Sequence, residues 1–268
     1  MMGASATRVS SPRRALRASG DLVYTSLQVV RGSGRCLREY FLEVLRQATI
    51  LATGSTLIVL TLVFVFGLSI GVEGSFGARL AGAPSLAALA PAIGGLRELT
   101  PYAFGYMMAA KVSTGYVAEI GTMRICDEID ALDVMGIDSL VYLGSTRLLG
   151  TWIMLPLIYG LSVLVGFIGA FLTAVLEVGQ VSAGGYLRLF WEFQSPGDLL
   201  FSVLKGMIMG TFVVLVGIYY GYRVRGGPAE VGRATARAMI VNLVGIHLIG
   251  MLTTQGFWGS NPRLPIGG

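Results

Sequence analysis

Long apolar runs separated by short polar segments dominate this chain. The first of them, from Ile50 to Val72, contains 23 residues and no charged side chain. At 1.5 Å per helical residue, that length is enough to cross a hydrocarbon core about 30 Å thick. Similar runs at 49–72, 99–120, 146–176, 198–222 and 234–256 predict an all-α integral membrane protein with five transmembrane helices.

The connections between these spans differ in character. Residues 73–84 form a polar connection, and the apolar run that follows at 85–96 is interrupted by Pro91, Gly94 and Gly95. That stretch is either a half-inserted helix or the start of the second span. Residues 177–197 predict an amphipathic connection whose aromatic side chains suit a membrane interface.

Both ends of the chain are more polar than the spans. Residues 1–34 are rich in Arg, Ser and Gly, and we expect a flexible basic leader there. From 35 to 48, apolar and charged side chains take opposite helical faces, which predicts an interfacial amphipathic helix that leads into the first span. Residues 257–268 form a short tail after the last span.

One segment between spans, 123–136, is built like a short water-soluble helix and is called the acidic segment below. Ile125, Ile129 and Leu132 recur at i, i+4 and i+7 and predict one narrow apolar stripe. The rest of its circumference carries acids and one misplaced apolar residue: Asp127, Glu128, Asp130, Asp133 and Val134. Gly136 predicts the end of this helix.

Composition and charge agree with this pattern. Hydrophobic residues make up 54% of the chain and charged residues 13%, as in membrane proteins. Fourteen arginines lie in the leader, the interfacial helix and the connections that would share their side, against four on the other. The positive-inside rule therefore places the N-terminus and the acidic segment in the cytoplasm and the C-terminus outside the plasma membrane. The arginines follow this topology instead of forming one patch, so no nucleic-acid partner is expected.

The sequence lacks the residues needed for nucleotide hydrolysis and for a zinc site. A phosphate-binding loop needs Lys before Ser or Thr, but the two lysines are followed by Val112 and Gly206. One His and two distant cysteines, Cys36 and Cys126, do not suggest a zinc site, and a cytoplasmic disulfide is not expected. We therefore assign no catalytic or metal-binding residue and no cofactor to this chain, and we expect a protein other than an enzyme.

The ionisable residues at membrane depth are the most informative polar positions, because each costs several kcal/mol there unless it is paired or hydrated. Arg97, Glu98 and Lys205 are expected at a similar depth near the outer side, and Lys111 and Glu119 share a face of the second span. Two interpretations stay open. The groups either pair and hold the bundle together, or they line a hydrated cavity that receives a charged headgroup.

The acidic segment also has two interpretations. It is either a solvated loop helix or the site at which a separate ATPase transmits force to a chain that has no energy source of its own. In the second case its acids would dock beside basic residues of the ATPase, and its apolar stripe would fill a cleft there.

Three blocks of sequence carry a resemblance that bears on these alternatives. Leu96-Arg-Glu-Leu-Thr-Pro101, the stretch 109–123 and the stretch 127–138 closely resemble the MlaE/YrbE permease family. The end of the chain, 261–268, is similar to that of actinobacterial YrbE proteins of Mce loci. The resemblance implies a permease domain over 49–256 that serves as the membrane subunit of an ABC transporter for phospholipids, fatty or mycolic acids, or sterols.

The resemblance also implies partners and residue roles. The partners are two cytoplasmic ATPases that bind ATP and Mg, a second permease subunit (a heterodimer is favoured over a homodimer), and MCE-domain proteins outside. The residues expected to couple to the ATPase are Asp127, Glu128, Ile129, Asp130, Leu132 and Asp133. The polar residues expected in the lipid pocket are Arg97, Glu98, Lys111, Glu119 and Lys205, although arginine is more usual than lysine at position 111. The alternatives are an ion-coupled secondary transporter with Lys111 and Glu119 as a charge relay, and a membrane assembly subunit without transport.

Overall fold

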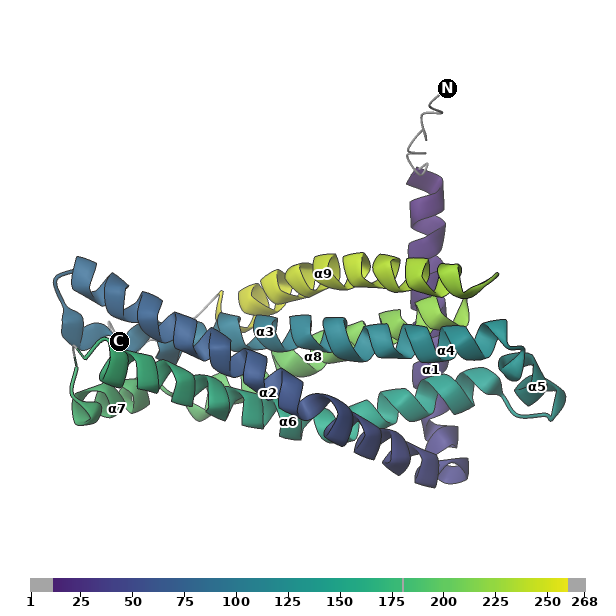
Figure 1. Ribbon diagram of the computed structural model, residues 1–268, viewed down its shortest axis with the longest axis horizontal. Coiled ribbons are helices and arrows are strands. Elements are labelled where there is room, and N and C mark those ends of the chain that lie inside the picture. Colours follow the sequence, from purple (N-terminus) through teal and green to yellow (C-terminus); the bar gives the residue numbers. More distant parts are fainter. Residues whose placement is uncertain (1–11, 180, 260–268) are drawn as a thin grey trace.

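The computed structural model describes residues 12–179 and 181–259, and within these ranges the chain is helical, with no strand. The long helices run along one bundle, except α1, which lies across it (Figure 1). α5 lies at one end of this bundle and α7 at the other (Figure 1). The elements are α1 Pro12–Glu39, α2 Phe41–Leu80, η1 Pro84–Leu86, η2 Ala90–Leu99, α3 Thr100–Met107, η3 Met108–Ser113, α4 Thr114–Ile125, α5 Glu128–Val134, η4 Val141–Ser145, α6 Thr146–Leu172, η5 Thr173–Glu177, α7 Ala183–Glu192, α8 Pro196–Tyr222 and α9 Pro228–Trp258.

Four helical stretches are long and apolar enough to cross a membrane, namely Phe41–Leu80, Val141–Glu177, Pro196–Tyr222 and Pro228–Trp258. They confirm the prediction of an all-helical, multi-pass membrane protein. The predicted second span, 99–120, lies in an unbroken helical course from Ala90 to Ile125 that η2, α3, η3 and α4 form together. This course carries charged side chains along its length and is not among the four apolar stretches. The count of five spans therefore stays a prediction.

The same helical course includes most of the stretch 85–96. Residues 90–96 belong to η2 and continue without a break into α3, so they are part of the course that holds the second predicted span. The polar connection expected at 73–84 is shorter than predicted, because α2 continues to Leu80. The amphipathic connection expected at 177–197 contains the helix α7, in which Tyr186 and Phe190 are buried and Trp191 is exposed.

The prediction for the N-terminal region was wrong in two respects. Residues 12–34, expected to be a flexible leader, belong to α1, while residues 1–11 lie outside the described part of the chain. The interfacial helix expected at 35–48 is divided at Tyr40, where α1 ends and α2 begins. α1 packs on the bundle through one narrow face of small buried side chains, Thr25, Val29, Ser33 and Cys36. This face is hard to recognise in the sequence, because arginines surround it.

Small residues hold α1 and α2 close to their neighbours. The Ser145 hydroxyl donates a hydrogen bond of 2.7 Å to the Val29 carbonyl, which ties α1 to η4. A Cβ atom at Gly67 would collide with the Gly166 carbonyl, so α2 and α6 approach with backbone against backbone. Glycines in α8 have the same packing role, since they lie against Tyr159 and Ser113.

We predict that Gly67→Ala destabilises the bundle, because the added methyl group meets backbone atoms that cannot move aside. Overpacking of this kind costs about 1–3 kcal/mol, which should lower the melting temperature of the detergent-solubilised protein. Gly77→Ala, in the same helix with no atom within 4 Å of the new Cβ, is the matched control and should melt at or above the wild-type temperature. Equal melting temperatures for the two variants would contradict the close α2–α6 contact.

Candidate functional site

Two ion pairs join η2 to α8 inside the bundle. Arg97 and Glu98 are adjacent in η2, and their partners Asp198 and Lys205 are two helical turns apart in α8. Each of the two helices contributes one cation and one anion. Along η2 the cation comes first, whereas along α8 the anion comes first. The cluster as a whole is neutral, which limits the cost of burying it.

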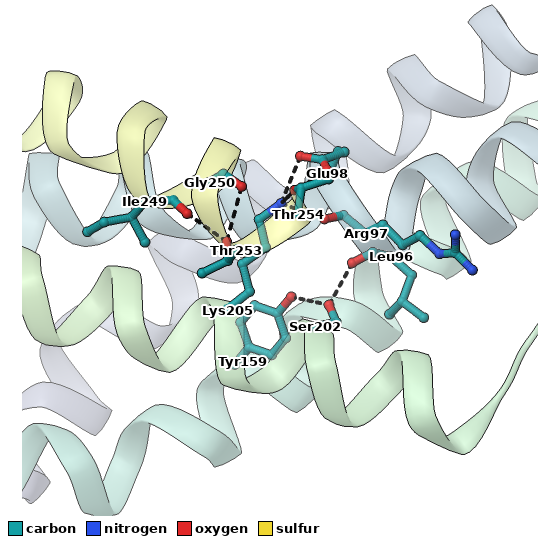
Figure 2. A network of polar contacts seen from close by, with 10 residues as sticks. All are labelled: Leu96, Arg97, Glu98, Tyr159, Ser202, Lys205, Ile249, Gly250, Thr253 and Thr254. Atoms are coloured by element: carbon teal, nitrogen blue, oxygen red, sulfur yellow. Dashed lines mark hydrogen bonds and ion pairs between the residues drawn. The ribbon is translucent and has the colours of Figure 1, made fainter. Parts of the chain in front are cut away.

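Lys205 is the centre of this cluster and is fully buried. Its ammonium group donates hydrogen bonds of 2.8 Å to the Arg97 carbonyl, 2.8 Å to Glu98 Oε2 and 2.7 Å to Thr254 Oγ1 (Figure 2). A lysine ammonium has three N–H donors. All three are therefore used by the protein itself, and Lys205 ties η2, α8 and α9 together.

The Arg97 side chain points away from Lys205 (Figure 2). Its guanidinium donates a hydrogen bond of 2.9 Å to Asp198 Oδ2, and its Cζ lies 5.4 Å from the centre of a ring of Trp258. The indole N–H of Trp258 donates a hydrogen bond of 2.6 Å to the other oxygen of Asp198. Both oxygens of this buried carboxylate are thus satisfied.

Glu98 is the most exposed charged residue of the cluster. Its side chain is 38% exposed, against 11% for Arg97, 3% for Asp198 and 0% for Lys205. One of its oxygens accepts from Lys205 and the other from Thr254 (Figure 2). Three of the five residues expected in a lipid pocket belong to this cluster, and Glu98 is the one of these three best placed to meet a ligand; the role of all three stays a prediction.

Lys111 and Glu119 lie on a different surface from this cluster. Both line a groove of about 190 Å³ between α4 and α2. Glu119 accepts a hydrogen bond of 2.6 Å from the nearly buried Arg147, while Lys111 is exposed and has no ion pair among the described residues. The structure therefore brings these two predicted residues to one groove but does not pair them with each other.

The exposed face of η3 and α4 differs from the outer faces of the other long helices. Elsewhere the exposed positions carry large apolar side chains, such as Leu57 in α2, Leu157 in α6 and Ile240 in α9. On this face the exposed residues are small or polar: Ala110, Lys111, Gly115, Ala118, Glu119 and Thr122. Such a surface is poorly suited to contact with acyl chains.

The acidic segment is not one helix, as predicted, but two. α4 ends at Ile125, Asp127 adopts a left-handed conformation with φ of 59°, and α5 begins at Glu128. Aspartate is one of the few residues that tolerates this conformation. The predicted stop is confirmed, because α5 ends at Val134, Met135 caps it and Gly136 follows with a φ of 77°.

The apolar stripe of α5 faces the bundle. Ile129 is fully buried, and Leu132 is half-buried against the same core. The expectation that these two side chains fill a cleft in an ATPase is therefore wrong for this conformation, because the nearest apolar surface is that of the chain itself. Val134 and Met135, with 88% and 66% of their surface exposed, are the apolar residues that α5 and its end present outward.

The four predicted acids of this segment differ in their bonds. Asp130 accepts a hydrogen bond of 2.6 Å from Arg124, and Asp133 accepts one of 3.2 Å from the Ser139 backbone N–H. Asp127 and Glu128 are exposed and form no side-chain hydrogen bond with the described residues. These two carboxylates are thus the ones most available to a partner.

Several residues of the η2–α8 cluster were missed by the sequence analysis, among them Asp198, Thr254 and the hydrogen-bonded pair Tyr159 and Ser202, which are 2.6 Å apart. A signal for Asp198 existed, because an acid seven residues before Lys205 shares its helical face. Thr254 and Trp258 carried no such signal, since only the packing of α9 against α8 brings them to the cluster.

An all-helical bundle with four helical stretches long and apolar enough to cross a membrane, and with charged residues paired inside it, has the architecture of a multi-pass membrane protein. The sequence matches the family described as Permease MlaE over residues 44–255. The chain belongs to this family and is therefore a membrane permease subunit. The match covers most of the chain, including the cluster, the groove and the acidic segment.

Individual relatives agree with this membership. A probable ABC transporter permease protein of Rickettsia bellii is 27% identical over 219 residues, which cover 82% of this chain and 84% of the relative. A probable ABC transporter permease protein of Synechocystis is 30% identical over 152 residues, or 57% of each chain. The protein TRIGALACTOSYLDIACYLGLYCEROL 1, chloroplastic, of Arabidopsis thaliana is 25% identical over 162 residues, which cover 60% of this chain and 46% of the relative.

We predict that Lys205→Met destabilises the bundle by about 3 kcal/mol, because it leaves Glu98 without its ion-pair partner. The lower end of the usual range applies because Glu98 is partly exposed. Glu98→Gln combined with Lys205→Met should recover part of this loss, since no unpaired charge remains. Unfolding of each variant in mixed micelles, followed by circular dichroism, measures the difference. A single variant as stable as the wild type would show that Lys205 does not hold the helices together.

Proposed function

We propose that this permease subunit moves lipids in an ABC transporter, driven by a separate cytoplasmic ATPase that docks on the acidic segment. The observation that carries this proposal is the small and polar exposed face of η3 and α4. An exposed Lys111 at membrane depth needs either a protein partner or a hydrated cavity. A second permease copy that covers this face would provide both, with the groove beside Lys111 and Glu119 opening into a shared cavity.

Lipid is the cargo that such a cavity suits. A headgroup would lie beside Lys111 and Glu119, while acyl chains would follow apolar side chains such as Ile50 and Leu51, which line the same groove. The Arabidopsis relative bears the name of a galactolipid. The choice among phospholipids, fatty or mycolic acids and sterols depends on partners outside the membrane, for which we propose MCE-domain proteins.

The ATPase would dock on the outward side of α5. Asp127 and Glu128 supply exposed negative charge, and Val134 and Met135 supply exposed apolar surface a turn or two away. Ile129 and Leu132, which pack on the bundle, would pass a push on α5 directly to the core. Two permease copies, with a heterodimer favoured, would bind two ATPases.

The alternative of an ion-coupled transporter rests on a relay between Lys111 and Glu119. The bond from Arg147 to Glu119 disfavours it, because the carboxylate is held by a permanent cation instead of exchanging a proton with Lys111. The alternative of a membrane assembly subunit without transport predicts no response of the chain to ATP hydrolysis.

We predict that Glu128→Lys weakens co-purification with the ATPase and reduces ATP-driven lipid transport by about tenfold or more, because it replaces an exposed anion with a cation at the proposed contact. Val134→Ser should act in the same direction by removing exposed apolar surface. Pull-down of the ATPase and transport in proteoliposomes measure the two effects.

The matched control for this charge reversal is Glu192→Lys, which changes an exposed glutamate at the α7 end of the bundle. It should leave both ATPase binding and transport at wild-type levels. If Glu128→Lys also bound the ATPase and transported normally, the docking assignment would be wrong, whereas the fold and family membership would stand.

The cytoplasmic location of α5 can be tested with the two native cysteines. Cys126 is exposed next to α5, whereas Cys36 is fully buried in α1, where burial and the nearby Glu39 raise the pKa of its thiol to about 11. Because the thiolate is the reactive form, Cys36 should not react at neutral pH.

We therefore predict that a membrane-impermeant maleimide labels the protein in inside-out vesicles but not in intact spheroplasts. Cys126→Ser should abolish the labelling, and Cys36→Ser should leave it unchanged. Labelling of Cys126 from the outside would reverse the proposed orientation.

A further inference from the structure

A cavity of about 510 Å³ lies at the α5 end of the bundle, away from the Lys111 groove. It is lined by α1, by the last turn of α4 and by the end of α8 with the residues that follow it. Its charged lining consists of three arginines, Arg124, Arg223 and Arg225, and no carboxylate is among the described residues that line it. Tyr24 and Gln28 of α1 add neutral polar groups.

The arginines keep most of their hydrogen-bonding capacity. Arg124 donates one side-chain hydrogen bond, to Asp130, and Arg223 donates one, of 3.0 Å, to Asp21. Arg225 is exposed and forms no ion pair with the described residues. Since a guanidinium has five N–H donors, the cavity offers many unused donors and one cation that no acid balances.

A neighbouring cavity of about 270 Å³ shares Arg223 and Arg225 and is also lined by Arg237 and by Glu230, which is paired with Arg233. The larger cavity has three arginines and no carboxylate in its lining, so it is the better site for an anion. Arginine forks fit the oxygen atoms of a phosphate group with paired hydrogen bonds. The chemistry of the larger cavity thus favours a phosphate.

The position of the cavity on α1 indicates where that phosphate comes from. Val23, Leu27 and Val30 recur at i, i+4 and i+7 and form an exposed apolar face of α1. Tyr24 and Gln28, which line the cavity, directly follow Val23 and Leu27 in the sequence. They therefore lie between the exposed apolar face and the buried face of α1. A molecule with its phosphate in the cavity would reach the apolar face of α1 with its hydrocarbon part.

We propose that this cavity binds the phosphate group of an anionic phospholipid from the leaflet in which α1 lies, as a lipid site separate from the transport cavity. The site does not depend on the cargo of the transporter. It is connected to α5, because Arg124 belongs to both the cavity and the ion pair with Asp130. A phosphate bound in the cavity would therefore compete with Asp130 for Arg124 and would change the contacts of α5, on which the ATPase is proposed to dock.

The test uses the full chain in a nonionic detergent, with native mass spectrometry to count bound dioleoyl phosphatidylglycerol. Arg225→Gln should weaken lipid binding by about tenfold, because charge-assisted hydrogen bonds to the phosphate are lost. The matched control is Arg233→Gln, which removes the same charge from the α9 side without touching the cavity lining and should bind lipid as the wild type does.

A second variant tests the location without changing charge. Gln28→Trp places a large side chain in the cavity, and Gln28 is exposed, so folding should be preserved. It should reduce phosphatidylglycerol binding to a similar extent. Binding at the wild-type level in Arg225→Gln or in Gln28→Trp would overturn the proposal.

Competition with inorganic phosphate distinguishes the two sources of the ligand. If millimolar phosphate leaves the bound lipid in place, the ligand is a membrane lipid, as proposed. If phosphate displaces the lipid in the wild type and in Arg233→Gln, the cavity is a phosphate site that a soluble compound fills, and the lipid assignment falls.

Discussion

The cost of a charge inside a membrane is the constraint on which this structure depends. Arg97, Glu98, Asp198 and Lys205 would each be expensive to bury alone, but as two pairs of opposite order they form a neutral cluster in which the buried groups are hydrogen-bonded. The cluster links η2, α8 and α9, which are far apart in the sequence. The cluster therefore fixes the position of the continuous helix 90–125, which carries the small and polar face of η3 and α4, relative to α8 and α9.

This constraint separates two kinds of charged residue in the same protein. In this structure all three donors of Lys205 are bonded to the protein, so the side chain links η2, α8 and α9. Lys111 is exposed on η3 and has no ion pair among the described residues. A charged side chain that is paired inside the bundle stabilises the fold. A charged side chain exposed to the hydrocarbon would be costly, so it requires a protein partner or a hydrated cavity. Both η2 and η3 are π-helical, a form that is frequent at functional sites.

Much of the fold could be predicted from local patterns, and the site only in part. The apolar runs predicted the membrane helices, because hydrophobicity and helix length can be read from consecutive residues. The direction of the Ile129 and Leu132 stripe could not be predicted, because a stripe does not reveal which apolar surface covers it. The partner of Arg97 was missed because Asp198 is 101 residues away in the chain and only the helix packing brings them together. The helical nature of α1 was hidden because its buried face is narrow and made of small residues.

The measurement that tests the central claim most directly is a density map of the assembled transporter in lipid nanodiscs, at a resolution that shows side chains. The account predicts a second permease copy facing α4, with headgroup density within hydrogen-bonding distance of the Lys111 ammonium and none at Lys205. Acyl chains of the surrounding bilayer packed against Lys111 and Gly115, or a headgroup bound to Lys205, would contradict it.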